Sequence, residues 1–537
     1  MQHINKRNKW SLSIGCVGRD LCYTLVSLFL LTYLQYTGLF NTTQFVVISI
    51  IIIVCRVWDA VNDPMMGTII TNTKTRFGKY RPWLLIGAIL NSIFLVLMFT
   101  VRFEDGWTNV IFIGLIYLFW GMTYTMNDIA YWDLLPALAS EKKERDNLTT
   151  MVAVFASIGA FISGGLVPII TPGNMVNMYK IIAIIWAIVF LACQLLVFFG
   201  VHDNKDDTFI EIKDEENEQM EEEKVSLKKM LKILFSNKQL LVMAVVVLLY
   251  SLGSAILNAF GQNFFYFKFG YLDSKGVGLN GGTMMLIFTV IYALGTIISQ
   301  AIYPTLANKF KRNQLVNFSI ITIAIGYTLF FILANVLHGM ICFIILCLLG
   351  IFIFLAQGVF YLAMLVMLTN TIEYGEWKTG KNYAAITFTV RPFMVKLAGA
   401  IQYGIVALAL IVCGLYTITE NVGDVEVILG MITENEISTY QQIEAYLLDA
   451  GHELSNFKEY INSSLSLAEL QDGLKSYASS LFEASSASMW GLTAVMCIVP
   501  MIMFIIALIV IRRKYIIDEE MYDKILKDIN EGKKSES

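Results

Sequence analysis

Charged residues are scarce in this sequence. Only 15% of its 537 residues are Asp, Glu, Lys or Arg, whereas a soluble domain usually carries about 25% charge because water must wet its surface. Hydrophobic residues make up 56% of the chain, and the mean hydropathy is +0.63. Most apolar side chains must therefore face something other than water, and the composition indicates a protein whose main partner is the lipid bilayer.

Residues that commonly build metal sites and active sites are also few. The eight cysteines are scattered singly through apolar segments, with neither a CxxC pair nor the spacing of Cys/His ligands, so a disulfide framework and a structural metal are not expected. The chain has four histidines and no GxSxG, HExxH or Walker sequence. We therefore expect no catalytic residues and no cofactor. The net charge of -4, without a long basic stretch, argues against a nucleic-acid partner.

Long apolar runs recur along the chain. A helix needs about 20 apolar residues to cross the hydrocarbon, and twelve stretches of this kind occur near residues 12–33, 45–70, 83–101, 108–135, 149–170, 176–201, 240–268, 282–306, 315–335, 338–369, 386–416 and 488–511. The first is too long for a signal peptide and no small-residue cleavage site follows it, so we expect a retained span. The prediction is an all-α polytopic membrane protein with twelve transmembrane helices in two six-helix bundles.

Lysine and arginine are distributed unevenly between the connections. Basic clusters fall on even-numbered connections and after the last span, at 74–81, 142–145, 228–232, 309–312, 378–381 and 512–514. The connections 34–44 and 171–177 contain neither residue. Because basic loops stay on the inner side of the membrane, we expect the N and C termini to be cytoplasmic.

The predicted domain organisation follows from these segments. An N-terminal six-helix bundle (1–201) precedes a cytoplasmic linker (202–238) with an acidic run and an amphipathic end. Spans seven to eleven (239–416), an extracytoplasmic helical insert (417–486), span twelve (487–512) and a cytoplasmic tail (513–537) follow. The apolar spacing in the insert predicts two or three short amphipathic helices. The insert either caps the outer mouth of a cavity or is a peripheral decoration.

Two acidic residues lie at helical spacing in the second span. A charge in a span is costly and marks a functional candidate, and Asp59 and Asp63, four residues apart, share one helix face. Paired carboxylates suit a hard cation such as Na⁺ or Li⁺. Alternatively, repulsion between them favours a bound proton, or the acids form an ion pair with Arg56 or Lys396.

A second polar face lies in the fourth span. Tyr124, Asp128 and Trp132 recur at i, i+4 and i+8, and they offer a carboxylate for sugar hydroxyls together with aromatic faces for the apolar side of a sugar ring. The alternative is an aromatic packing stripe. In the first span, Asp20 either accepts substrate hydroxyls or is neutralised by Arg19.

Four segments together resemble a known family: 56–67 (RVWDAVNDPMMG), 75–83 (TRFGKYRPW), 120–132 (WGMTYTMNDIAYW) and 373–378 (EYGEWK). They closely resemble the glycoside–pentoside–hexuronide:cation symporters of the major facilitator superfamily. The resemblance covers nearly the whole chain except 417–486. It implies the major facilitator fold and a multi-pass protein of the bacterial inner membrane that functions as a monomer.

The resemblance also implies roles for individual residues. It assigns a cation site to Asp59, Asn62, Asp63 and Thr125, with Na⁺ or Li⁺ at Asp59 and Asp63. It assigns a sugar site to Arg19, Asp20, Tyr124, Asp128, Trp132 and Tyr361, and it places Lys396 between the two sites as a coupling residue. Ala153 stands where the family pattern has a sugar-contacting arginine.

The expected function is symport of a sugar or glycoside with Na⁺, Li⁺ or H⁺. The alternative is a transporter of lysolipids or other amphiphiles from the same superfamily, since distant relatives of the family resemble lysolipid carriers.

Overall fold

The computed structural model describes residues 5–73, 75, 77–138, 142–201, 227–272, 275, 278–381, 384–462 and 465–532. Within these ranges the regular secondary structure is helical, with no β-strand. Twelve of the described helices are long and apolar enough to cross a membrane, which confirms the predicted all-α, twelve-span fold class. The acidic run of the predicted linker, and Lys74 and Arg76 of the first basic cluster, lie outside the described residues.

The first of two compact units comprises Met1–Leu34 and Leu39–Leu227. Its six spans are α1 (Lys6–Tyr36), α2 (Thr42–Thr71), α3 (Arg81–Thr100), α4 (Gly106–Leu138), α5 (Lys142–Ile170) and α6 (Met175–Gly200). Helix α4 packs against both α2 and α3, and α3 packs against α6. Helix α4 therefore has neighbours that can position its polar face.

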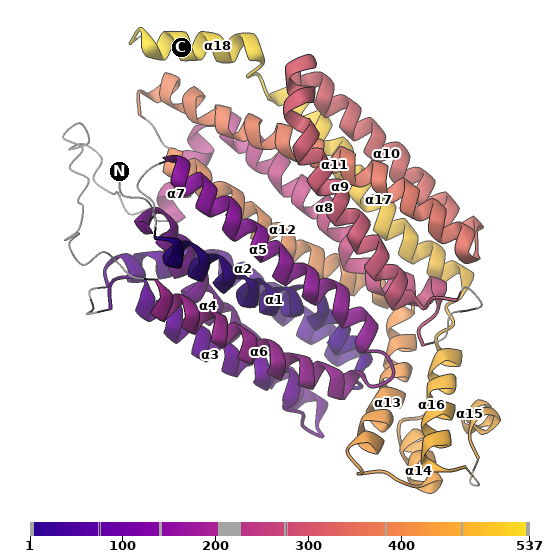
Figure 1. Ribbon diagram of the computed structural model, residues 1–537. Helices are drawn as coiled ribbons and strands as arrows, with labels where there is room; N and C mark the ends of the chain where they lie inside the picture. The colour runs from indigo at the N-terminus through magenta and orange to yellow at the C-terminus, as the bar shows by residue number, and fades with distance from the viewer. Residues whose placement is uncertain are drawn as a thin grey trace. The chain divides into compact units, whose positions relative to one another are not determined.

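The second unit comprises Gln35–Gly38 and Lys228–Ser537. Its spans are α8 (Lys238–Phe269), α9 (Gly281–Lys309), α10 (Arg312–Val336), α11 (Gly339–Thr379), α12 (Ala384–Val412) and α17 (Ser486–Lys514), and the amphipathic α7 (Leu227–Ser236) precedes them. Helix α8 packs against α12 and α17, and α10 against α11 and α17. The four helices α13 (Leu415–Thr433), α14 (Tyr440–Asp449), α15 (Leu454–Tyr460) and α16 (Leu467–Leu481) lie together at one end of this unit, whereas α18 (Glu519–Asn530) lies at the other (Figure 1).

The insert differs from the prediction in its helices. Its described residues form four helices, α13 to α16, rather than two or three. The span predicted to reach residue 416 ends at Val412, because Gly414 adopts a left-handed φ of 68° that breaks the helix. In the structure Val422, Val425 and Leu429 form a buried apolar face of α13. The sequence prediction did not include this helix, because acidic residues interrupt the apolar pattern.

The structure does not test every part of the predicted organisation. The domain boundaries, the cytoplasmic location of both termini and the outer location of the insert stay predictions.

Candidate functional site

Arg19 on α1 lies at the centre of a charged network in the first unit. Its Nη2 and Nε atoms donate to Oδ2 of Asp20 at 2.8 and 3.1 Å, and its Nη1 lies 3.0 Å from Oδ1 of Asp128 on α4. Trp132 donates from its indole Nε1 to the same Asp128 oxygen at 3.1 Å. The structure therefore brings together four of the residues predicted for the sugar site.

The arginine is inaccessible, whereas its two carboxylate partners are within reach of a ligand. The side chain of Arg19 is 3% exposed, compared with 21% for Asp20 and 34% for Asp128. The guanidinium carbon also lies 4.7 Å from the ring centre of Tyr131 and 4.9 Å from that of Trp132, an attractive cation–π arrangement. Arg19 thus orients both carboxylates while its own guanidinium stays buried.

Asp20 has capacity left for another hydrogen bond. Its Oδ2 accepts hydrogen bonds from the guanidinium of Arg19 and from the Sγ–H of Cys16, whose sulfur lies 3.2 Å away. Its Oδ1 has no hydrogen-bond partner within the described part of the chain. The two alternatives for Asp20 are therefore compatible, because one oxygen is neutralised by Arg19 and the other can accept a hydroxyl.

Buried amides hold α4 in place. Asn127 donates to the carbonyl of Leu84 on α3 at 2.8 Å and to Oε1 of Gln194 on α6 at 3.2 Å. Gln194 in turn donates to the carbonyl of Gly15 on α1 at 2.9 Å. Because a buried polar group without a partner is costly, these bonds favour one rotation of α4, with Asp128 directed toward Arg19.

An aromatic row lies beside the network. The ring of Tyr124 stacks on Tyr23 of α1 at 4.9 Å and on Trp120 at 5.5 Å, and Trp120 stacks on Tyr117 at 5.8 Å. Tyr23 is 42% exposed, so its ring remains accessible. Sequence reasoning missed Tyr23, although its position three residues after Asp20 on the same helix was an available signal.

The predicted cation residues come together where α2 meets α4. Thr125 donates from Oγ1 to Oδ1 of Asp63 at 3.2 Å. A Cβ added at Gly121 would lie 2.5 Å from Oδ1 of Asp59, so that carboxylate lies directly against α4. Asn62 is buried, and its amide nitrogen has no hydrogen-bond partner among the described residues. The cluster offers carboxylate, hydroxyl and amide groups, which are the ligand types that hard cations prefer.

Tyr361 and Lys396 belong to the second unit. The hydroxyl of Tyr361 on α11 accepts a hydrogen bond from Nη2 of Arg391 on α12, and the Tyr361 ring lies 5.4 Å from that of Tyr250 on α8. Lys396 is half-buried on α12. The placement of Tyr361 and Lys396 beside the residues of the first unit stays a prediction.

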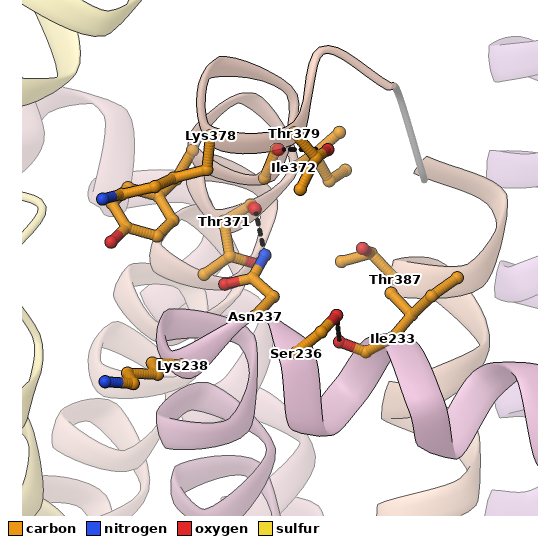
Figure 2. Close-up of a pocket in the computed structure, with 11 residues that line it drawn as sticks. Ile233, Ser236, Asn237, Lys238, Thr371, Ile372, Lys378, Thr379 and Thr387 are labelled. Atoms are coloured by element: carbon orange, nitrogen blue, oxygen red, sulfur yellow. Dashed lines mark hydrogen bonds between the residues drawn. The ribbon is translucent and has the colours of Figure 1, made fainter. Parts of the chain in front are cut away.

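A cavity of about 270 Å³ in the second unit contains none of the predicted site residues. It lies where α7 meets α8, beside the end of α11 and the start of α12, and Figure 2 shows Asn237 donating to the carbonyl of Thr371 at its edge, at 3.0 Å. Lys378 lines the cavity, and its ammonium interacts with the Trp377 ring, whose centre lies 5.9 Å away. Nothing in this lining indicates a sugar or cation site.

Comparison with known proteins identifies the family. Residues 11–432 match the family described as MFS/sugar transport protein. A lactose permease of Lactobacillus delbrueckii subsp. bulgaricus is 30% identical over 427 residues, which cover 76% of this chain and 64% of the permease. A glucuronide carrier protein homolog of Escherichia coli K12 is 26% identical over 80% of this chain and 89% of its own length. The matched chain thus spans less than two thirds of the lactose permease.

The fold is also found among solved transporters. The crystal structure of a bacterial homolog of the human lysosomal transporter Spinster aligns with a TM-score of 0.55 at 9% identity, over 99% of this chain and 98% of that one. Together with the twelve apolar helices, the bacterial relatives indicate a multi-pass protein of the inner membrane. The chain belongs to the MFS/sugar transport protein family, and its resemblance to the glycoside–pentoside–hexuronide:cation symporters of the major facilitator superfamily is confirmed.

Proposed function

We propose that this protein is a secondary active symporter that moves a sugar or glycoside together with Na⁺, Li⁺ or H⁺ by alternating access. Its similarity to a lactose permease and to a glucuronide carrier homolog supports a glycoside as the substrate. The observation that carries the proposal is the Arg19–Asp20–Asp128 network with Trp132, because it presents two accessible carboxylates beside an aromatic face.

The chemistry of this network suits a sugar better than an amphiphile. An ionised carboxylate accepts strong hydrogen bonds from hydroxyl groups, and the apolar face of a pyranose ring packs on an indole or phenol ring. A lysolipid, the alternative substrate, would need a long apolar channel for its acyl chain. Asp20 and Asp128 have no evident use in such a channel, since charges are costly beside hydrocarbon.

Cation coupling in this proposal depends on α4. Two carboxylates in a span are costly unless a cation neutralises them, and Asp59 and Asp63 both meet α4, at Gly121 and Thr125. The same helix carries Tyr124 between these two positions, and Asp128 and Trp132 about one and two turns beyond Thr125. A cation that orders the α2–α4 contact therefore favours the α4 position that binds sugar, and the sugar must raise the cation affinity by the same factor.

Several finer assignments belong to the same proposal. Tyr361 extends the sugar site from the second unit, and Lys396 serves as the coupling residue between the sugar and cation sites. The termini face the cytoplasm, on the basis of the basic clusters, and the functional unit is a monomer.

Uptake into proteoliposomes tests this function. The purified protein is reconstituted and offered lactose, raffinose, a pentose and a glucuronide, each with a Na⁺, a Li⁺ or a H⁺ gradient or with none. We expect at least one sugar to accumulate above equilibrium with one ion gradient and only to equilibrate without it. Transport of a lysolipid, without binding of any sugar, would instead support the amphiphile alternative.

A further inference from the structure

Residues 35–38, which are the end of α1 and the start of the link to α2, pack within the second unit and are called here the 35–38 connection. Tyr36 is fully buried there, and its hydroxyl donates to Oδ1 of Asn263 on α8 at 2.7 Å. Its ring stacks on Tyr271 at 6.0 Å and on Phe482 at 5.9 Å, with interplanar angles of 13° and 12°. Phe482 directly follows α16, so the insert supplies one side of the socket that holds Tyr36.

Two glycines allow the connection to lie directly on α13 of the insert. A Cβ added at Gly423 would lie 2.7 Å from the backbone nitrogen of Gly38 and 3.2 Å from the carbonyl carbon of Tyr36. Gly38 itself has a φ of 60°, and a Cβ there would lie 3.0 Å from Cγ2 of Val427. This close approach requires glycine at position 423, where a Cβ would meet backbone, and the left-handed φ favours glycine at position 38.

One buried side chain of the 35–38 connection lacks hydrogen-bond partners within the described part of the chain. Gln35 is 1% exposed, and neither its amide oxygen nor its amide nitrogen has a hydrogen-bond partner among the described residues. A buried amide without partners costs free energy that hydration would return. The aromatic packing of Tyr36 favours the position of the connection against α13. Gln35 favours a position in which water reaches its amide. The two positions are therefore closer in free energy than the packing alone implies.

A single helix, α1, joins the 35–38 connection to the proposed sugar site. Helix α1 runs without a break from Lys6 to Tyr36, so Arg19 and Asp20 lie on the same rod as Tyr36, about 24 Å along its axis at about 1.5 Å per residue. Fixing one end of a rigid helix restricts the motion of the other.

We propose that the insert is a latch: α13 and Phe482 hold the 35–38 connection in one state of the transport cycle and release it in another. The latch rests on the proposed transport function and gives the insert a part in the conformational change, which neither a cap over the cavity nor a peripheral decoration would have. Coupling itself stays with residues of the spans.

A reversible cross-link tests whether release is required. The double variant G38C/V427C places two thiols where Gly38 and Val427 now approach each other, and G38C and V427C alone control for the native cysteines. Each variant is compared with its own reduced form, because a side chain at position 38 is itself strained. On oxidation we expect uptake and sugar exchange by the double variant to fall at least tenfold and to recover with dithiothreitol, while oxidation leaves each single variant at its own reduced level. Normal transport by the cross-linked protein would overturn the latch.

Labelling of a buried position tests release without measuring transport. Thr37 is fully buried, so in Thr37→Cys a membrane-impermeant maleimide should react slowly at rest and several-fold faster during incubation with sugar and cation. Gly423→Val, whose Cβ displaces the connection, should give fast labelling throughout. The exposed Thr43 nearby, as Thr43→Cys, is the matched control and should label readily in every condition.

The two arms separate failure of the latch from failure of the proposed function. Slow labelling of Thr37→Cys in the Gly423→Val background would show that the connection does not depend on α13, and would overturn the latch whether or not sugar is transported. If no sugar is transported by the native protein, the symport proposal fails, while the Gly423→Val comparison still tests the seat.

Discussion

The hydroxyl of Thr125 on α4 donates a 3.2 Å hydrogen bond to Oδ1 of Asp63 on α2. This bond ties an acid proposed to bind the coupling cation to the helix that presents Asp128. Because Thr125 and Asp128 are three residues apart on one helix, any shift of α4 that accompanies cation binding also moves Asp128. The proposed coupling therefore needs no long chain of contacts between the two sites.

Neutralising either acid of α2 should uncouple transport. In Asp59→Asn or Asp63→Asn we expect concentrative uptake to be abolished, because the site loses the charge that attracts the cation, while sugar exchange persists at least in part. Uptake and counterflow in proteoliposomes measure the two activities separately. Intact concentrative uptake in both variants would show that the cation assignment is wrong.

A methyl group on α4 should disturb the cation site without removing a ligand. In Gly121→Ala the added Cβ would lie 2.5 Å from Oδ1 of Asp59, so the carboxylate must move. We expect the cation concentration for half-maximal uptake to rise by about tenfold, equivalent to about 1.4 kcal/mol.

Gly67→Ala is the matched control, because a Cβ at Gly67 meets no atom within 4 Å. The two variants are compared by cation titration at fixed sugar. The same cation dependence in both would place Asp59 outside the cation site.

Replacing the sugar-contacting side chains of α4 should weaken sugar binding more than it lowers the amount of folded protein. In Asp128→Asn and Trp132→Ala we expect the Kd for sugar to rise about ten- to a hundredfold, since a charge-assisted hydrogen bond contributes roughly 1.5–3 kcal/mol. Arg19 keeps Asp20 as a partner in Asp128→Asn, so the amount of folded protein should change little. Calorimetric sugar binding and the yield of monodisperse protein provide the test, and near-native affinity in both variants would move the site elsewhere.

Tyr23 should contribute to sugar affinity through its ring. In Tyr23→Ala we expect the Kd to rise roughly two- to tenfold, the range expected for an aromatic contact of about 0.5–1.5 kcal/mol. Tyr23→Phe keeps the ring stacked on Tyr124 and should bind sugar almost as the native protein does. Equal losses in the two variants would instead assign the contribution to the hydroxyl.

The amino-acid sequence by itself determined the features that depend on neighbouring residues. The twelve spans follow from the length and apolarity of local stretches. The i, i+4 spacing places Asp128 and Trp132 within hydrogen-bond reach on α4. The break after Val412 was missed, because the left-handed conformation of Gly414 interrupts an apolar run that looks continuous.

Only the tertiary structure decided which helices meet. The pairing of Arg19 with Asp128, the bond from Thr125 to Asp63 and the seating of Gly38 on Gly423 each join different helices or segments. The spacing from Asp20 places Tyr23 on the same face of α1, but only the packing of α1 against α4 showed that its ring stacks on Tyr124. A local pattern tells which face of a helix is polar, but not which helix that face meets, because helix packing depends on side-chain shape along the whole contact.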